Sequence, residues 1–277
     1  MFSGAVWFMG KIISVANQKG GVGKTTTAIN LAACLALAGR KVLIVDIDPQ
    51  GNASSGLGIN LSDNKKGIYE LLSGDASLDQ VIYSTDIDTL KVIPSNVDLA
   101  GAEIELVGRD QREKILSTVL KGVDSEFEFV IIDCPPSLGL LTLNALTISK
   151  SVLIPMQCEY YALQGLTHLL KTIKRVKKSI NSRLKVEGII LTMYDSRTLL
   201  AEQVESQVRK YFSEFLMKTI IPRNIRLSEA PSHGKPIVLY ASRSKGSDSY
   251  VALAQEIIQR TKNEIMKKEK QQIESVV

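Results

Sequence analysis

A glycine-rich stretch near the start of the chain constrains the fold more than any other feature. An apolar, β-branched run over residues 11–16 precedes it, and a helical pattern over residues 25–38 follows it. Strand, glycine-rich loop and helix in this order form a phosphate-binding loop, because backbone N–H groups and the helix N-terminus then face one anion. The stretch reads Asn17-Gln18-Lys19-Gly20-Gly21-Val22-Gly23-Lys24-Thr25-Thr26.

The polar residues of this loop predict nucleotide and metal binding. Lys24 is placed to reach the β- and γ-phosphates of a nucleoside triphosphate, and the Thr25 hydroxyl is placed to ligate Mg²⁺. We therefore expect this loop to bind a nucleoside triphosphate together with Mg²⁺. The candidate nucleotide-binding residues of the loop are Lys19, Gly20, Gly21, Val22, Gly23, Lys24, Thr25 and Thr26.

The loop departs from the standard pattern G-x-x-x-x-G-K-[ST] at its first position, where Gln18 replaces a glycine. A second lysine, Lys19, stands directly before Gly20. This K-G-G-x-G-K-T form resembles the deviant loop of the ParA, MinD and nitrogenase-iron-protein ATPases. The resemblance implies that Lys19 is a catalytic residue that reaches the partner's phosphates across a nucleotide-sandwich dimer. The alternative is a solvated loop lysine beside an ordinary glycine turn.

Two acids follow the second expected strand, residues 41–46. Asp46 and Asp48 are two residues apart, at the strand end where open parallel sheets bind ligands. The run Asp46-Ile47-Asp48-Pro49-Gln50-Gly51-Asn52 resembles switch I of the same family. That resemblance implies that Asp48 positions and polarises the attacking water, and that Asp46 holds a water of the Mg²⁺ shell. The alternative for one such acid is a helix or turn cap.

Another acid, Asp133, ends an apolar run over residues 129–132. An apolar strand that ends in an aspartate is typical of the Walker B element, whose carboxylate binds Mg²⁺ directly or through water. The following residues 135–139, Pro-Pro-Ser-Leu-Gly, resemble the family's switch II. No internal arginine finger is apparent, and Lys19 in trans could supply that charge. The candidate metal residues are Thr25, Asp46 and Asp133.

Residues 221–237 form a third diagnostic stretch, rich in Pro, Asn and Arg. Such a loop is more often a connector than a site, but its order resembles the ParA/Soj subgroup. The resemblance implies that Pro222 and Asn224 contact the adenine, and that Arg226 and Arg197 face DNA. The family resemblance as a whole covers residues 11 to about 260. His168 and His233 lack metal or triad partners in the sequence and are interpreted as structural or solvated.

Apolar β-rich runs alternate with helical patterns along nearly the whole chain. This predicts an α/β fold with a doubly wound, mostly parallel sheet and helices on both faces. Strands are expected over residues 11–16, 41–46, 90–94, 127–133, 151–156, 186–192 and 218–221. Helices are expected over residues 25–38, 67–72, 98–120, 140–149, 163–181, 199–215 and 247–268.

A single ATPase domain is expected over residues 11–266, followed by a polar tail over residues 267–277. Residues 1–10 are expected to be a disordered leader. A weak interfacial anchor, or an upstream start codon with Met9 as the true start, are the alternatives for this segment. Membrane spanning is not expected, because no run of about 18 apolar residues occurs. The three cysteines, Cys34, Cys134 and Cys158, have no C-x-x-C spacing and are typical of a reduced, cytoplasmic protein.

The net charge of +5 is unevenly distributed. Residues 1–164 hold 13 Lys+Arg and 18 Asp+Glu, whereas residues 165–277 hold 21 and 11, which gives balances of −5 and +10. Such asymmetry indicates a surface for a polyanion, or else only solvated helix faces.

Together these features favour an ATP-switched partition ATPase of the ParA/Soj type. It would dimerise with ATP, bind double-stranded DNA without sequence preference at the nucleoid, and release it after slow hydrolysis stimulated by a ParB-like partner. A MinD-like membrane-cycling ATPase should carry a C-terminal amphipathic helix, which the tail does not show. An ATP-dependent reductase or cluster-assembly enzyme, the other alternative, should carry paired cysteines.

Overall fold

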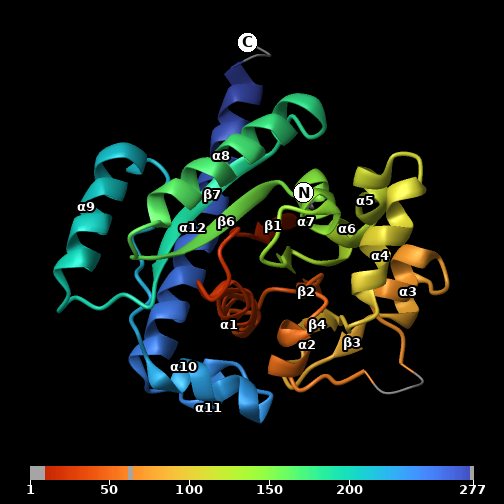
Figure 1. The fold of residues 1–277 in the computed structure, drawn as a ribbon, viewed down its shortest axis with the longest axis horizontal. Coiled ribbons are helices and arrows are strands. Elements are labelled where there is room, and N and C mark those ends of the chain that lie inside the picture. Colours follow the sequence, from red (N-terminus) through yellow and green to blue (C-terminus); the bar gives the residue numbers. More distant parts are fainter. Residues whose placement is uncertain (1–9, 62–64, 275–277) are drawn as a thin grey trace, which may run out of the picture.

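A seven-stranded sheet forms the centre of the molecule in a computed structural model that describes residues 10–61 and 65–274 (Figure 1). The strand order is β3-β4-β2-β5-β1-β6-β7, and each neighbouring pair is parallel except β3 with β4. The expected α/β, doubly wound, mostly parallel sheet is therefore confirmed. The strands are β1 (Lys11–Val15), β2 (Val42–Asp46), β3 (Tyr83–Ser84), β4 (Leu90–Ile93), β5 (Phe129–Asp133), β6 (Ser151–Gln157) and β7 (Lys185–Thr192).

Helices cover both faces of the sheet (Figure 1). One face is covered by α1 (Lys24–Leu37), α2 (Asn52–Gly56), α10 (Ile225–Glu229), α11 (Ile237–Tyr240) and the long α12 (Lys245–Glu274). The other is covered by α3 (Ile68–Ser73), α4 (Leu99–Glu105), α5 (Ile115–Val119), α6 (Val123–Glu126), α7 (Leu140–Ile148), α8 (Ala162–Ser179) and α9 (Leu199–Phe212). Short 3₁₀ turns are η1 (Leu78–Gln80), η2 (Leu106–Gly108), η3 (Arg112–Lys114) and η4 (Ala230–His233).

The strands are apolar on both sides because both sides are covered. In β2, Ile44 packs toward α1, whereas Leu43 and Val45 pack toward the opposite helical layer. Every residue of β1, β2 and β5 is buried. Continuous apolar runs are what such central parallel strands need.

The expected strand over residues 218–221 is wrong, because this segment belongs to no strand of the described chain. Single bridges pair Leu216 with Ile189 and Pro222 with Tyr194. Between them, the Glu256 carboxylate accepts hydrogen bonds from the backbone N–H groups of Lys218 and Thr219, both at 3.0 Å. A side chain of α12 therefore satisfies backbone groups that a strand ladder would otherwise pair.

The expected single helix over residues 98–120 is also wrong. The segment divides into α4, η2, η3 and α5. The interruption contains Gly108 and Gln111, and Gln111 has a left-handed φ of 51°. One residue in that conformation ends a right-handed helix. The chain already leaves helical geometry at Arg109, which is extended (ψ 142°). α4 is therefore a separate short helix, and it packs against α3 (Figure 1).

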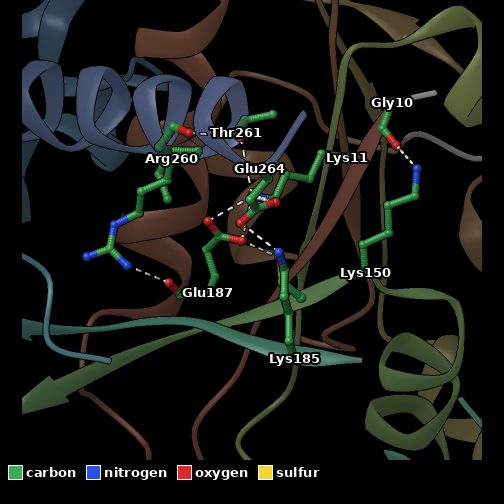
Figure 2. Close-up of polar contacts among 10 residues, drawn as sticks. Gly10, Lys11, Lys150, Lys185, Glu187, Arg260, Thr261 and Glu264 are labelled. Atoms are coloured by element: carbon green, nitrogen blue, oxygen red, sulfur yellow. Dashed lines mark hydrogen bonds and ion pairs between the residues drawn. The ribbon is translucent and has the colours of Figure 1, made fainter. Parts of the chain in front are cut away.

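A buried polar network ties the amino-terminal end of the sheet to α12 (Figure 2). Lys11 of β1 pairs with Glu187 of β7 at 2.8 Å and donates to the Thr261 hydroxyl at 3.2 Å. Glu264 of α12 lies 3.3 Å from the same ammonium and 2.6 Å from that of Lys185. Three elements distant in sequence are thereby joined.

The helix that carries this network continues to Glu274, so residues 267–274 of the expected tail are helical. Apart from Gly10, the expected leader over residues 1–10 lies outside the described residues, as do residues 275–277. Whether the chain functions as one domain over 11–266 stays a prediction.

Candidate functional site

One cleft of about 720 Å³ opens at the carboxyl ends of the parallel strands, where α/β sheets bind ligands. It is lined by the glycine-rich loop with the start of α1, by the loop after β2, and by residues 221–225, 227 and 228. The fold thus brings together three stretches that the sequence placed far apart. The loop residues on its wall are Gly20, Gly21, Gly23, Lys24, Thr25 and Thr26.

The backbone of the glycine-rich loop is shaped to hold an anion. Gly21 and Gly23 have φ values of +73° and +83°, a region in which a side chain would be strained. Gly23 is the N-cap of α1, and no side chain caps this helix, so its first N–H groups face the cleft. Val22 is buried, and its carbonyl oxygen accepts a hydrogen bond from the Thr192 hydroxyl at 2.8 Å. This bond fixes the loop against the end of β7.

The two lysines of the loop lie in different surroundings. Lys24 is buried, and its Nζ donates to the carbonyl oxygen of Lys19 at 3.1 Å. Burial lowers the pKa of Lys24, and the negative charges of Asp133 and Asp48 oppose this shift. The side chain of Lys19 is instead half-exposed and forms an ion pair with Glu159, which follows β6. Lys24 is therefore held inside the loop, whereas Lys19 is held at its rim.

Asp133 ends β5 as a fully buried carboxylate. Neither of its oxygens has a hydrogen-bond partner among the described residues. Burial, followed by the negative charge of Asp46, raises the pKa of Asp133 well above its ordinary value, and Thr25 and Lys24 offset only part of this. Because a buried, unpaired acid costs free energy, this position fits a cation.

Asp46 lies directly across from Asp133 in the β2–β5 register. Its Oδ2 accepts from the backbone N–H and the hydroxyl of Ser54 at 2.9 and 2.7 Å, and its Oδ1 accepts from the backbone N–H of Asp48 at 3.1 Å. Burial raises the pKa of Asp46 to about 6, although these hydrogen bonds oppose the rise. With its lone pairs largely occupied, Asp46 fits a ligand of a metal-bound water better than a direct ligand.

The donor set fits Mg²⁺ only with help from a nucleotide and water. No group of three or more His, Cys, Asp or Glu within residues 10–61 and 65–274 is arranged to hold a metal alone. Mg²⁺ commonly takes one or two protein oxygens, several waters and phosphate oxygens. Asp133, the Thr25 hydroxyl and, through water, Asp46 can supply the protein's share.

Asp48 lies on the wall of the cleft, and its side chain is turned in from the surface. The residue is only 7% exposed, and its Oδ1 accepts from the backbone N–H of Gln50 at 3.0 Å. This bond leaves Oδ2 available to a water in the cleft. The carboxylate is therefore close to the expected phosphates without belonging to the buried acid pair.

Two loops run side by side beyond the end of β7. The backbone N–H of Tyr194 donates to the carbonyl of Ile221, and that of Arg223 donates to the carbonyl of Tyr194, both at 3.0 Å. On the second loop Pro222 and Asn224 line the cleft. The Asn224 Oδ1 caps α10 by accepting from the backbone N–H of Arg226 at 2.9 Å, which leaves its amino group for a ligand.

The two arginines singled out in the sequence lie beyond the carboxyl ends of the strands, Arg197 on the first loop and Arg226 in α10, which follows the second loop. Arg223 on the second loop is exposed as well. The Arg197 side chain is 86% exposed, and Asp195 accepts its hydrogen bonds at 2.8 and 2.7 Å. The Arg226 side chain is 55% exposed and pairs with Glu229 at 2.8 Å. The local acids that hold both arginines were not expected from the sequence.

Three residues of the site were missed in the sequence. Glu159 holds Lys19, Thr192 fixes the loop, and Ser54 holds Asp46. A signal existed for two of them, because Thr192 ends β7 and Glu159 lies two residues after β6. Both lie at the strand ends, where open parallel sheets gather their functional residues.

None of the helices in the described part of the chain is long and apolar enough to cross a membrane. Cys34 and Cys134 are buried, Cys158 is half-buried, and all three are free thiols.

Comparisons with known proteins agree with this geometry. The family described as AAA domain matches residues 10–186. The chain is 57% identical to the sporulation initiation inhibitor protein Soj of Bacillus subtilis (strain 168) over 249 residues, 90% of this chain and 98% of that protein. It is 53% identical to the chromosome-partitioning ATPase Soj of Treponema pallidum (strain Nichols) over 252 residues, 91% of this chain and 98% of that protein.

A solved structure extends the similarity to bound ligands. Cobyrinic acid a,c-diamide synthase from Mycobacterium smegmatis, solved with bound ADP and magnesium, aligns with a TM-score of 0.80 and 38% sequence identity. The alignment covers 92% of this chain and 96% of that one.

Proposed function

The chain belongs to the Soj/ParA family of chromosome-partitioning ATPases, and we propose that it is an ATP-gated switch that binds DNA as a dimer and releases it after hydrolysis. It is an ATPase whose cofactors are ATP and Mg²⁺. The observation that carries the proposal is the common location of two features. The cleft and the buried, unpaired Asp133 lie at the carboxyl ends of the strands, and so do the segments that carry the exposed Arg197 and Arg226.

In this proposal the cleft residues divide the work of hydrolysis. Bound ATP would supply the phosphoanhydride bond that is hydrolysed, and Mg²⁺ would supply positive charge that offsets the negative charge of the phosphates. Lys24 and the loop backbone hold the phosphates, and Pro222 and Asn224 contact the adenine. Thr25 and Asp133 orient the metal, with Asp46 acting through water. Asp48 accepts a hydrogen bond from the attacking water and thereby polarises it.

Lys19 is assigned to the partner protomer. In the described protomer it is half-exposed at the cleft rim and paired with Glu159, so it can turn outward once that pair opens. Gly20 supports a close approach of two loops, because in its own protomer a Cβ there would meet only Pro136, at 4.0 Å. Any crowding by a side chain at Gly20 would therefore come from the second copy.

DNA binding is assigned to Arg197 and Arg226, each of which would contact phosphate and not base edges. Such contacts position the protein without specifying sequence, so double-stranded DNA of any sequence is the expected ligand. Dimerisation would double the number of arginines on one surface. Stimulation of hydrolysis by a ParB-like protein, and location in the cytoplasm at the nucleoid, complete the proposal.

The test is fluorescence anisotropy on two unrelated duplexes over a salt series, with ATP, with ADP and without nucleotide. We expect tight binding only with ATP and equal affinity for the two duplexes. Equal affinity in ATP and ADP would reject the gating, and a strong preference for one duplex would reject the non-specific contacts.

Three variants separate the assigned tasks. Asp48→Ala should bind ATP, remain dimeric and lose hydrolysis about 10²–10⁴-fold, the usual contribution of such a residue. Lys24→Ala should lose nucleotide binding, and Lys19→Ala should bind ATP as a monomer. Single-turnover hydrolysis and light scattering in ATP measure these outcomes. A Lys19→Ala protein that dimerises like the wild type would remove the cross-dimer role.

A further inference from the structure

The segment over residues 97–107, which comprises α4, the turn before it and the 3₁₀ turn η2 after it, carries apolar side chains on two opposite faces. Its inner face, Leu99, Ala102 and Leu106, is buried against the sheet. Its outer face is exposed at Val97 (72%), Ile104 (80%) and Val107 (54%), with exposed Ala100 between them. The spacing of 97, 100, 104 and 107 places these four residues, the α4 stripe, on one side of the helical segment. A helix that is apolar on both faces requires a second covering surface.

Acids flank the stripe on both sides. At 100° per residue, Asp98 and Glu105 lie on one flank and Glu103 lies on the other, and Asp110 follows in the turn after η2. The only basic residue between positions 96 and 110 is Arg109, which donates to the carbonyls of Leu72 and Ser73. None of the four acids has an ion-pair partner within residues 10–61 and 65–274. The surface is therefore complementary to an apolar segment flanked by Lys and Arg.

The turn before α4 is bonded to switch I. The backbone N–H of Ser95 donates to the Ser54 hydroxyl at 2.9 Å, and that hydroxyl donates to Asp46 at 2.7 Å. A Cβ on Gly51 would lie 2.8 Å from the Ser95 carbonyl oxygen, so the two backbones touch without space between them. A shift of α4 at this end is transmitted to Asp46 through two hydrogen bonds.

The body of α4 contacts the start of α7, directly after switch II. The Glu103 Oε1 accepts from the backbone N–H of Leu141 at 3.4 Å and lies beside Gly139, where a Cβ would meet this carboxylate. Gly139 is the N-cap of α7 and no side chain of its own caps that helix. Glu103 thus takes the place of a capping residue for the helix that follows Asp133 by seven residues.

We infer that the α4 stripe is the docking surface for a basic, amphipathic segment of the protein that activates hydrolysis, and that α4 conveys its binding to both switches. The inference rests on the proposed function for the existence of such an activator. The stripe supplies apolar contact, and the flanking acids orient the basic residues of the docked segment. Ser95 connects the turn before α4 to Asp46 through Ser54, and Glu103 connects α4 to the start of α7 after switch II. Glu103 is a positioning residue in this scheme.

The experiment measures ATP hydrolysis of the full chain with DNA while the full-length ParB-like protein of the same genome is titrated in. In Ile104→Asp we expect unchanged basal hydrolysis and ATP-dependent dimerisation, with a half-saturating partner concentration at least about 10-fold higher. Leu37→Asp is the matched control, an aliphatic side chain 51% exposed at the end of α1, and should respond like the wild type. Equal stimulation of Ile104→Asp would overturn the docking site.

A second pair of variants tests the transmission. Glu103→Gln keeps an oxygen for the Leu141 N–H and should retain maximal stimulation, with weaker partner binding from the lost charge. Glu103→Ala removes that acceptor and should also lower maximal stimulation at saturating partner. Equal maxima would reject the link to switch II.

Two other results would contradict either the role of the α4 stripe or the proposed function of the protein. Loss of ATP-dependent dimerisation in Ile104→Asp would assign the stripe to contact between copies of this chain and would overturn the inference. A wild-type protein that shows neither ATP-gated DNA binding nor stimulation would instead refute the proposed function. Protection of Ile104→Cys from maleimide labelling by the partner provides a binding readout independent of hydrolysis.

Discussion

The two ends of the central sheet hold buried charges in opposite ways. At the amino end, Lys11 and Glu187 are buried and fully partnered, with Thr261, Glu264 and Ser151 completing the network (Figure 2). At the carboxyl end, Asp133 is equally buried, but its two oxygens have no hydrogen-bond partner in the described chain. The network at the amino end is complete as it stands, whereas the acid at the carboxyl end needs something that the protein itself does not provide.

This difference distinguishes buried charges that stabilise the fold from buried charges that are available to a ligand. A buried ion pair with its hydrogen bonds satisfied joins elements and does little else. A buried acid that lacks partners is retained at a cost in stability, which a bound cation can remove. The comparison therefore predicts that substitutions at the two ends have opposite effects on stability and unequal effects on hydrolysis.

The largest expected effect on stability is at the amino end. Glu187→Ala leaves Lys11 buried without its main counter-charge and should lower the free energy of unfolding by about 3–5 kcal/mol. Urea denaturation measures this, with Glu128→Ala as the control. That residue pairs with Arg40 at 2.9 Å with both side chains partly exposed, so its loss should cost no more than about 1 kcal/mol. If both variants lost similar amounts of unfolding free energy, the buried pair would be no more important for stability than the partly exposed one.

The opposite sign is expected at the carboxyl end. Asp133→Asn removes a buried negative charge beside Asp46 and should raise the free energy of unfolding of the nucleotide-free protein by about 1–3 kcal/mol at pH 8. Stabilisation by ATP with Mg²⁺ should shrink in the same variant. Thermal denaturation with and without MgATP measures both. A variant less stable than the wild type without nucleotide would show that Asp133 is structural.

The two ends of the sheet should contribute to stability with opposite dependence on pH. The pKa of Asp46 is raised from 3.8 to about 6, so the folded chain binds a proton that the unfolded chain has lost. The contribution of Asp46 to stability therefore falls as pH rises from about 4 to 6. At the amino end, burial alone would raise the pKa of Glu264, but the hydrogen bond from Lys185 and the charges of Lys11 and Lys185 bring it below 4.5.

The contribution of Glu264 is therefore present above about pH 4.5 and is lost as pH falls below it. Urea denaturation from pH 3.5 to 7 on Asp46→Asn and Glu264→Gln measures both slopes. Relative to the wild type, the first variant should gain stability near pH 7, and the second should lose it there. If the free energies of unfolding of the two variants changed with pH in the same way, the proposed difference between the two ends of the sheet would be wrong.

The smallest effect concerns the exposed arginines at the carboxyl edge. Hydrogen bonds from Arg197 hold the pKa of Asp195 at about 2, so Arg197→Ala should return that pKa toward its ordinary value, as NMR titration of the side chain can show. The same variant should lower the salt slope of DNA binding by about one unit per lost phosphate contact. An unchanged salt slope would exclude Arg197 from DNA contact.

The sequence predicted the sheet better than the helices around it. Six strands were placed within two residues at each end, because continuous apolar runs between turn residues have few other solutions. Residues 218–221 show the same pattern, yet Glu256 satisfies their backbone from α12. The helix predicted over residues 98–120 was too long. Hydrophobic periodicity continues through this segment and does not reveal a left-handed residue such as Gln111, which interrupts it.

The sequence by itself determined the chemistry of the cleft. A glycine-rich loop, two lysines and three strand-end acids each follow a local pattern, and local patterns can be read along a chain. Only the tertiary structure decided what surrounds them: Glu159 beside Lys19, Ser54 beside Asp46, no hydrogen-bond partner for the Asp133 oxygens among the described residues, and a complete network around Lys11. Partners from distant elements and burial from water set the electrostatics of each group, and both arise only when the chain is folded.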